Sequence, residues 1–140
     1  MASYNKFLQF TKDLVDGVHD FDAHTFKVAL TNTAPVNTNT VLANITQISA
    51  GNGYTTGGAA TSMSTSTSSG TAKVTGTDVV FTASGGSVGP FRYAVLYNDS
   101  PTSPADPLIA WWDYGSSVTL ADTETFTVDF DATNGIATVA

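Results

Sequence analysis

The densest group of side chains capable of chemistry lies between Asp16 and His24 and contains both histidines of the chain. Carboxylates and imidazoles bind divalent metal ions, but this spacing fits neither a calcium-binding loop nor the histidine pair of a zinc-binding helix. Aspartate is also common in turns, where its side chain accepts backbone hydrogen bonds. We therefore favour a solvated connection between a helix and a strand over an ion site.

No other pattern in the sequence predicts catalysis. The chain has no cysteine, which excludes a cysteine nucleophile and thiolate metal sites. The glycines from Gly51 to Gly58 do not have phosphate-loop spacing, so we expect a structural turn. Asp129 and Asp131 resemble the carboxylate pair of a glycosidase, but on the outer face of a strand they more simply discourage edge pairing. We predict no catalytic residue, no cofactor and no metal, and therefore no enzyme.

The aromatic residues are more informative. Trp111 and Trp112 are adjacent on a predicted strand, so their side chains point to opposite faces. One of them fills the core, and three roles stay open for the other: burial under a second layer, an anchor for a protein partner, or a platform for a sugar ring. Arg92, the only arginine, needs a carboxylate partner, and Asp113 is the candidate if their strands pair.

Charge limits the classes of partner. The net charge is -7, only five residues are basic, and none of these follows Arg92. Binding to phosphate backbones or anionic membranes requires clustered Lys and Arg, so the sequence disfavours nucleic acid and membrane partners. An acidic surface suits a basic protein partner, and it also serves solubility.

The chain of 140 residues is predicted to form one domain, 1–140. A helix is expected over about residues 3–17, with Ser3 as N-cap and Gly17 at its end. Short alternating segments then predict a mainly β fold, a jelly-roll-like antiparallel β-sandwich of about eight strands with one N-terminal helix. The expected strands are 25–31, 61–69, 72–75, 78–84, 89–98, 108–113, 124–131 and 136–139.

Three of these strands carry more specific predictions. The Ser/Thr-rich segment 61–69 is expected at a sheet edge, anchored by Met63. Segment 89–98 is apolar on both faces and therefore central, with Phe91 and Tyr93 on the same face. Asn134-Gly135 predicts a hairpin turn that returns the chain as its last strand.

Five segments of packing and turn residues together carry a resemblance to a known family: Val28–Pro35, Gly51–Tyr54, Phe81–Gly86, Gly89–Tyr97 and Trp111–Gly115. They resemble the capsid cement, or decoration, proteins of tailed bacteriophages. The resemblance spans nearly the whole chain.

The resemblance implies a jelly-roll-like virion structural protein on the outer capsid surface. Such proteins stabilise the shell by bridging major capsid subunits, and self-association, here as a homodimer, is expected. The family has no catalytic residues to carry over. With no signal peptide or transmembrane segment recognised, synthesis is expected in the bacterial host cytoplasm. The alternative is a tail or receptor-recognition β-sandwich module that binds a glycan or host surface.

The candidate interface residues come from the apolar face of the expected helix, the polar edge strand and the aromatic cluster. We expect Trp111 or the helix face to lie at an inter-subunit contact. The six candidates are Tyr4, Phe7, Leu8, Met63, Trp111 and Tyr114.

Overall fold

The computed structural model describes residues 2–140. Strands take up 48% of the chain and helix 8%, which confirms the mainly β class with antiparallel sheets and one α-helix. Residues 2–140 contain ten strands, where about eight were expected. In chain order the elements are β1 (Ser3–Lys6), α1 (Leu8–Val15), β2 (Phe26–Thr31), the 3-10 helix η1 (Leu42–Asn44), β3 (Ala59–Thr61), β4 (Met63–Ser68), β5 (Thr71–Gly76), β6 (Val79–Thr82), β7 (Val88–Asn98), β8 (Leu108–Leu120), β9 (Thr125–Val128) and β10 (Ala137–Val139).

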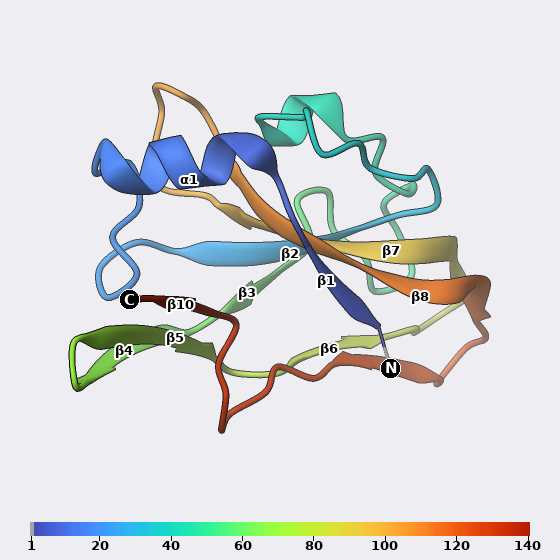
Figure 1. Cartoon of the computed structure of the whole chain (residues 1–140). Helices are drawn as coiled ribbons and strands as arrows, with labels where there is room; N and C mark the ends of the chain where they lie inside the picture. The colour runs from blue at the N-terminus through green and yellow to red at the C-terminus, as the bar shows by residue number, and fades with distance from the viewer. Residues whose placement is uncertain (1) are drawn as a thin grey trace.

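The strands form two layers (Figure 1). The upper layer in that view is a five-stranded sheet in the order β1-β8-β7-β2-β3, and the lower layer combines the sheets β10-β5-β4 and β6-β9. The main core lies between the layers and includes Phe10 of α1. A smaller core, which includes Phe7 and Leu42 of η1, lies on the outer face of the five-stranded sheet. This is a sandwich arrangement, and the jelly-roll connectivity stays a prediction.

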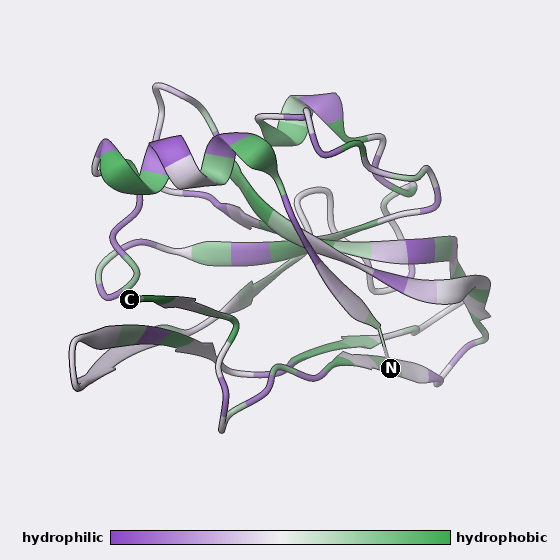
Figure 2. Ribbon diagram, in the orientation of Figure 1, coloured by the Kyte–Doolittle hydropathy of each residue, from purple (hydrophilic) through white to green (hydrophobic). Residues whose placement is uncertain are grey.

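The prediction of a helix over 3–17 is wrong at its start. Ser3–Lys6 instead forms β1, which pairs antiparallel with β8 and places Tyr4 opposite Trp112. The free edge of β8 satisfies backbone groups that a helix would leave unpaired at its first turn, so the strand replaces that turn. The helix ends as predicted, because Gly17 follows it with a φ of 77°. Figure 2 shows hydrophobic and hydrophilic residues alternating along α1. Among residues 2–140, no helix has the length and apolar character to cross a membrane.

The two central strands confirm the predicted alternation in one case and correct it in the other. In β2, Phe26, Val28 and Leu30 face the main core. In β7, however, Phe91 faces that same core, while Val95 and Tyr97 belong to the smaller core on the opposite face. Irregular pairing with β8 between Phe91 and Tyr93 reverses the alternation, so these two residues do not share a face as predicted.

The Ser/Thr-rich strand β4 is at a sheet edge, as predicted. It pairs only with β5, and Met63 at its start is half-buried against the main core. The exposed edge is partly covered, since the Asp22 carboxylate accepts hydrogen bonds from the Thr65 amide at 3.1 Å and the Thr65 hydroxyl at 2.7 Å.

The predicted hairpin at Asn134-Gly135 does not form. β9 pairs with β6, and β10 pairs with β5 in the other sheet of the lower layer. The turn is a local one, in which the Asp131 carboxylate accepts the Thr133 and Asn134 amides at 2.9 and 2.8 Å. A Cβ at Gly135 would lie 2.6 Å from the carbonyl oxygen of Val74, so the close approach to β5 requires glycine.

Candidate functional site

A groove with a volume of about 1020 Å³ opens between the two layers. One wall comes from β1, β7 and β8 of the five-stranded sheet, and the other from β9 and the turn after it. Aromatic residues dominate its lining: Tyr4, Phe91, Trp112, Tyr114, Phe126 and Phe130. No histidine lines it.

Strand pairing sets the position of each ring. Trp112 and Tyr114 are two residues apart on β8 and lie in the groove with Tyr4, which β1 places opposite Trp112. The ring centroids of Tyr4 and Trp112 are 5.8 Å apart, and those of Tyr114 and Phe126 are 5.4 Å apart. Trp112 also contacts Phe130 at 5.5 Å, and all three pairs are edge-to-face. The rings therefore support one another across the two layers.

The groove leaves apolar surface in contact with solvent. Tyr4 is 41% exposed and Tyr114 is 55% exposed. Trp112, Phe126 and Val128 pack against the main core but are only partly buried. The main core of the sandwich is therefore open at this side.

The single arginine is neutralised at the groove wall. Arg92 Nε and Nη2 donate to the two carboxylate oxygens of Asp113 at 2.7 and 3.0 Å, which confirms the predicted ion pair. The Arg92 hydrogen bonds, together with one from the Gly115 amide, lower the pKa of the Asp113 carboxyl. The guanidinium carbon also lies 5.4 Å from the centre of the Tyr93 ring.

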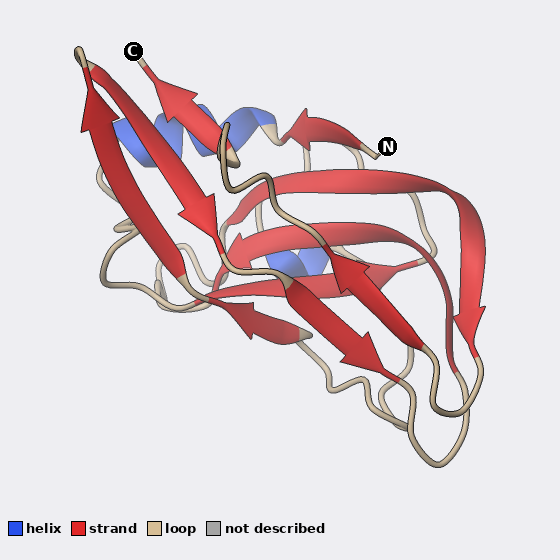
Figure 3. Cartoon of the chain, turned by 90° about the horizontal axis from the view of Figure 1, so that it is seen from below, coloured by secondary structure: helices blue, strands red, loops and turns tan. Residues whose placement is uncertain are grey.

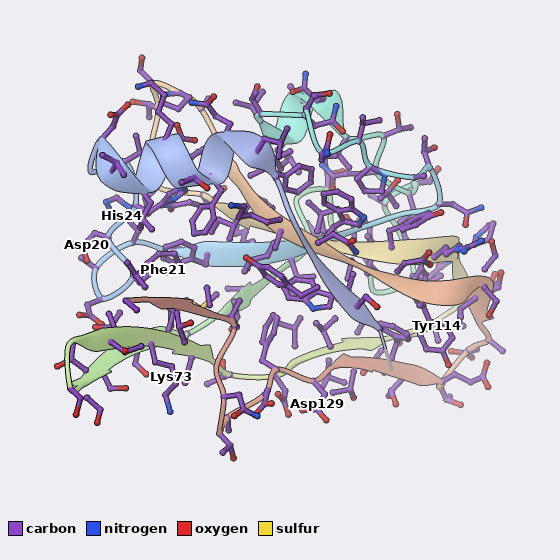
Figure 4. All side chains as sticks on the ribbon, viewed as in Figure 1. Asp20, Phe21, His24, Lys73, Tyr114 and Asp129 are labelled. Atoms are coloured by element: carbon purple, nitrogen blue, oxygen red, sulfur yellow. The ribbon has the colours of Figure 1, made fainter. Side chains whose placement is uncertain are left out.

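The remaining charges of the groove are acidic. Asp78 accepts the Phe130 amide at 3.0 Å, and the pKa of Asp131 is lowered by hydrogen bonds from Asn134 and Thr133. Asp129 is exposed and forms no hydrogen bond or ion pair with other residues in 2–140 (Figure 4). The groove thus combines aromatic walls with an acidic rim, which suits binding more than bond-breaking chemistry.

The histidine segment has a different structure from the one predicted. His24 and Asp20 lie at the outer end of the connection after α1 (Figure 4), but His19 is only 8% exposed. The Asn98 amide nitrogen donates to His19 Nδ1 at 3.1 Å and to His24 Nδ1 at 2.9 Å. Both Nδ1 atoms therefore accept, so the neutral ring of His19 carries its proton on Nε2. The expectation of a solvated connection is wrong for His19.

Burial changes the chemistry of His19. Desolvation lowers its pKa to about 4, against the opposing effect of Asp13. His19 Nε2 and Asp13 Oδ2 are both buried without a hydrogen-bond partner. Within residues 2–140, no three His, Cys, Asp or Glu residues come together as a metal-binding group. The arrangement ties the connection before β2 to the end of β7, which is a structural role.

The six candidate interface residues lie in different places. Tyr4 and Tyr114 both line the groove, whereas Leu8 is 56% exposed on α1. Trp111 is half-buried on the opposite face of β8, with its ring 4.6 Å from that of Phe7. Phe7 is fully buried, so it has no surface to offer a partner while this fold is kept. Met63 is half-buried on β4 and is not among the residues that line the groove.

Two functional features were missed by sequence reasoning. The groove uses Trp112 rather than Trp111, and the inward alternation of Phe126, Val128 and Phe130 was the available signal for its lower wall. Asn98, a fully buried polar residue at the end of an apolar strand, was the available signal for the histidine cluster.

Comparison of the chain with models of known protein families, with curated proteins and with solved structures found no match.

Proposed function

We propose that this chain is a virion structural protein, not an enzyme, which binds the outside of a capsid shell and stabilises it by bridging major capsid subunits. The observation that carries the proposal is a two-layer β-sandwich with free strand edges beside an open aromatic groove. The resemblance of its packing and turn motifs to phage cement proteins supports the same function.

Free strand edges are suited to protein contacts. β1 and β3 end the five-stranded sheet, and β4 and β10 end the three-stranded sheet. Such edges carry unpaired backbone groups that add to a partner by main-chain hydrogen bonds. Exposed apolar side chains supply further contact area: Tyr4, Leu8, Val15, Val36, Val80, Tyr114 and Val139.

The charge of the chain favours a protein partner with a basic surface. The net charge of -7 opposes binding to nucleic acid and to anionic membranes. Self-association as a homodimer belongs to the proposal, because a bridging protein gains from several weak contacts on one shell. Contacts made together act through effective concentration, so each contact can be weak.

Particles prepared with and without this chain test the proposal. We expect particles without it to assemble but to release DNA at a lower temperature and after milder osmotic shock. Adding back the purified chain should restore the release temperature, and density for the chain should lie on the outer shell in electron micrographs. Equal release temperatures with and without the chain would count decisively against a cement function.

A second candidate function is a tail or receptor-recognition module that binds a glycan. The aromatic rings and the exposed carboxylate of Asp129 at the groove favour it, since sugars stack on rings and donate hydroxyl hydrogen bonds to carboxylates. Copy number separates the two functions, because a shell holds hundreds of copies and a tail a few. Glycan-array binding that Tyr114→Ala abolishes would support the module.

A further inference from the structure

The lower layer stops one strand short of the upper layer at the groove. Phe126 of β9 packs against Phe91 of β7 at 4.9 Å and against Tyr114 of β8. β1 lies beyond β8 in the upper sheet, and its Tyr4 is 41% exposed. In Figure 3, where the lower layer is nearest the viewer, the outer side of β9 faces β8 and the N-terminus. A strand placed beside β9 would therefore lie under β1.

The outer edge of β9 is ready for backbone pairing. Residues of an antiparallel pair alternate between hydrogen-bonded and non-hydrogen-bonded positions. The Ala83 amide donates to the Glu124 carbonyl at 2.9 Å, so the register makes Phe126 and Val128 hydrogen-bonded partners of β6. Thr125 and Thr127 consequently direct their N–H and C=O groups away from β6, toward the side where the lower sheet has no further strand.

Charge defines the chemistry of the missing strand. Asp78, Asp129 and Asp131 line the groove, and Arg92 is already paired with Asp113. An added strand presents alternate side chains to opposite faces. Apolar side chains on one face would cover Tyr4 and Trp112, and Lys or Arg on the other face would meet the carboxylates.

We propose that the groove binds an extended segment of a partner protein, with alternating apolar and basic residues, as a third strand on the free edge of β9. This mode is β-augmentation, in which main-chain hydrogen bonds give affinity and side-chain pockets give specificity. The assignment of this segment to a shell subunit rests on the proposed function. The chemistry of the segment, with its apolar and basic faces, does not depend on that function.

A second copy of this chain fits the groove poorly. Its own β9 carries Phe126 and Val128, which already pack on its own core and cannot fill the groove of a neighbour. The last third of the chain has no basic residue, so it has no cation to set against Asp129. Pairing of β9 with the β9 of a second copy therefore supplies neither the apolar nor the basic side chains, and the proposed partner segment brings both.

Titration of the full chain with a blocked peptide of about seven alternating Lys and Val residues tests the proposal. We expect saturable one-to-one binding, with amide shifts at Thr125 and Thr127 and a shift of the Trp112 indole. Thr127→Pro removes an N–H group that points away from β6, so it leaves the hydrogen bonds between β9 and β6 intact. This variant should weaken peptide binding roughly tenfold or more. A peptide N-methylated at alternate residues should lose binding to the unaltered chain, which keeps the test independent of the folding of the variant.

Thr67→Pro is the matched control. The Thr77 amide donates to the Ser62 carbonyl at 3.0 Å, so the β4–β5 register also points the Thr67 amide outward, at an edge away from the groove. This variant should bind the peptide like the unaltered chain. Absence of saturable binding, equal binding of a Glu/Val peptide, or equal loss in both proline variants would overturn the proposal. A concentration-dependent dimer that only Thr127→Pro dissociates would also overturn it, because a second copy would then occupy the edge.

Attachment to particles separates this inference from the proposed function. If the unaltered chain does not attach to shells, the proposed function fails, while peptide binding still decides the chemistry of the edge. If Thr127→Pro attaches and stabilises shells as well as the unaltered chain, the cement function stands and the groove is not its contact.

Discussion

The stability of this chain should fall between neutral and mildly acidic pH because of His19. Its ring is buried among Phe10, Phe21 and Phe26, and its Nδ1 accepts a hydrogen bond from Asn98. Desolvation lowers the pKa of this ring from 6.5 to about 4. Asp13 of α1 raises the pKa and His24 lowers it, and both act less than burial does.

The direction and size of the effect follow from proton linkage. Between pH 6.5 and about 4, His19 is protonated in the unfolded chain and neutral in the folded one. The unfolded state therefore binds more protons, so the free energy of unfolding rises with pH across this window. Its contribution is fully present above pH 6.5 and is lost as pH falls to about 4. At 1.36 kcal/mol per pKa unit, the loss is about 3 kcal/mol.

Urea unfolding at a series of pH values, followed by tryptophan fluorescence, measures the effect. His19→Phe should flatten the pH dependence between 6.5 and 4, because Phe does not titrate and fits the same aromatic neighbours. The variant should be slightly less stable at neutral pH, by about 1 kcal/mol, since the hydrogen bond to Asn98 is lost. The lowered pKa values of Asp113 and Asp131 affect stability only below about pH 4, outside this window.

His24→Gln is the matched control, because it removes the other histidine that binds Asn98. This variant should keep the steep dependence of the free energy of unfolding on pH. If His19→Phe is as pH-dependent as the unaltered chain, or if the slope disappears only in His24→Gln, the assignment to buried His19 is refuted.

Three further predictions test the packing. Phe7→Ala should cost about 3–5 kcal/mol in urea unfolding, because Phe7 is fully buried, whereas Leu8→Ala should cost less than about 0.5 kcal/mol. Gly58→Ala should destabilise by more than about 3 kcal/mol, since its Cβ would lie 1.8 Å from a carbonyl oxygen of β2; Gly70→Ala, with a similar φ and open space, should cost about 1 kcal/mol. Arg92→Ala should change the free energy of unfolding little, because both partners of its ion pair are more than one-third exposed to solvent. Costs of similar size within the Phe7/Leu8 or glycine pair would contradict the burial described for these positions.

Features set by local alternation were predictable from the sequence. β2 confirms its inward face, the two tryptophans lie on opposite faces of β8, and Arg92 meets Asp113 across the β7–β8 pair. For β2 and the two tryptophans, the period of two residues along a strand fixes the direction of the side chain. The ion pair depends instead on the pairing of β7 with β8, in which Tyr93 lies directly opposite Asp113 and Arg92 is its neighbour. One correct strand pairing then fixes the ion pair.

Features set by competition between partners were not predictable. Ser3–Lys6 fits a helical pattern, yet the edge of β8 recruits it as β1. Asn134-Gly135 fits a hairpin, yet the chain crosses to pair with β5. A bulge reverses the faces of β7 near Phe91. Each outcome depends on a segment far away in the sequence, and local propensity contains no information about it.

The groove shows most clearly what local sequence patterns cannot predict. Phe126, Val128 and Phe130 alternate like the inner face of any complete sandwich, so the sequence alone cannot show that the layer lacks a neighbour for β9. What distinguishes an incomplete layer is apolar surface that stays exposed after folding, here at Tyr4 and Tyr114. Burying such rings is worth about 25 cal/mol for each Å² removed from water, so a partner strand that covers them gains affinity from side chains as well as from the β9 backbone. The open side of the sandwich is therefore the surface where a partner would gain most.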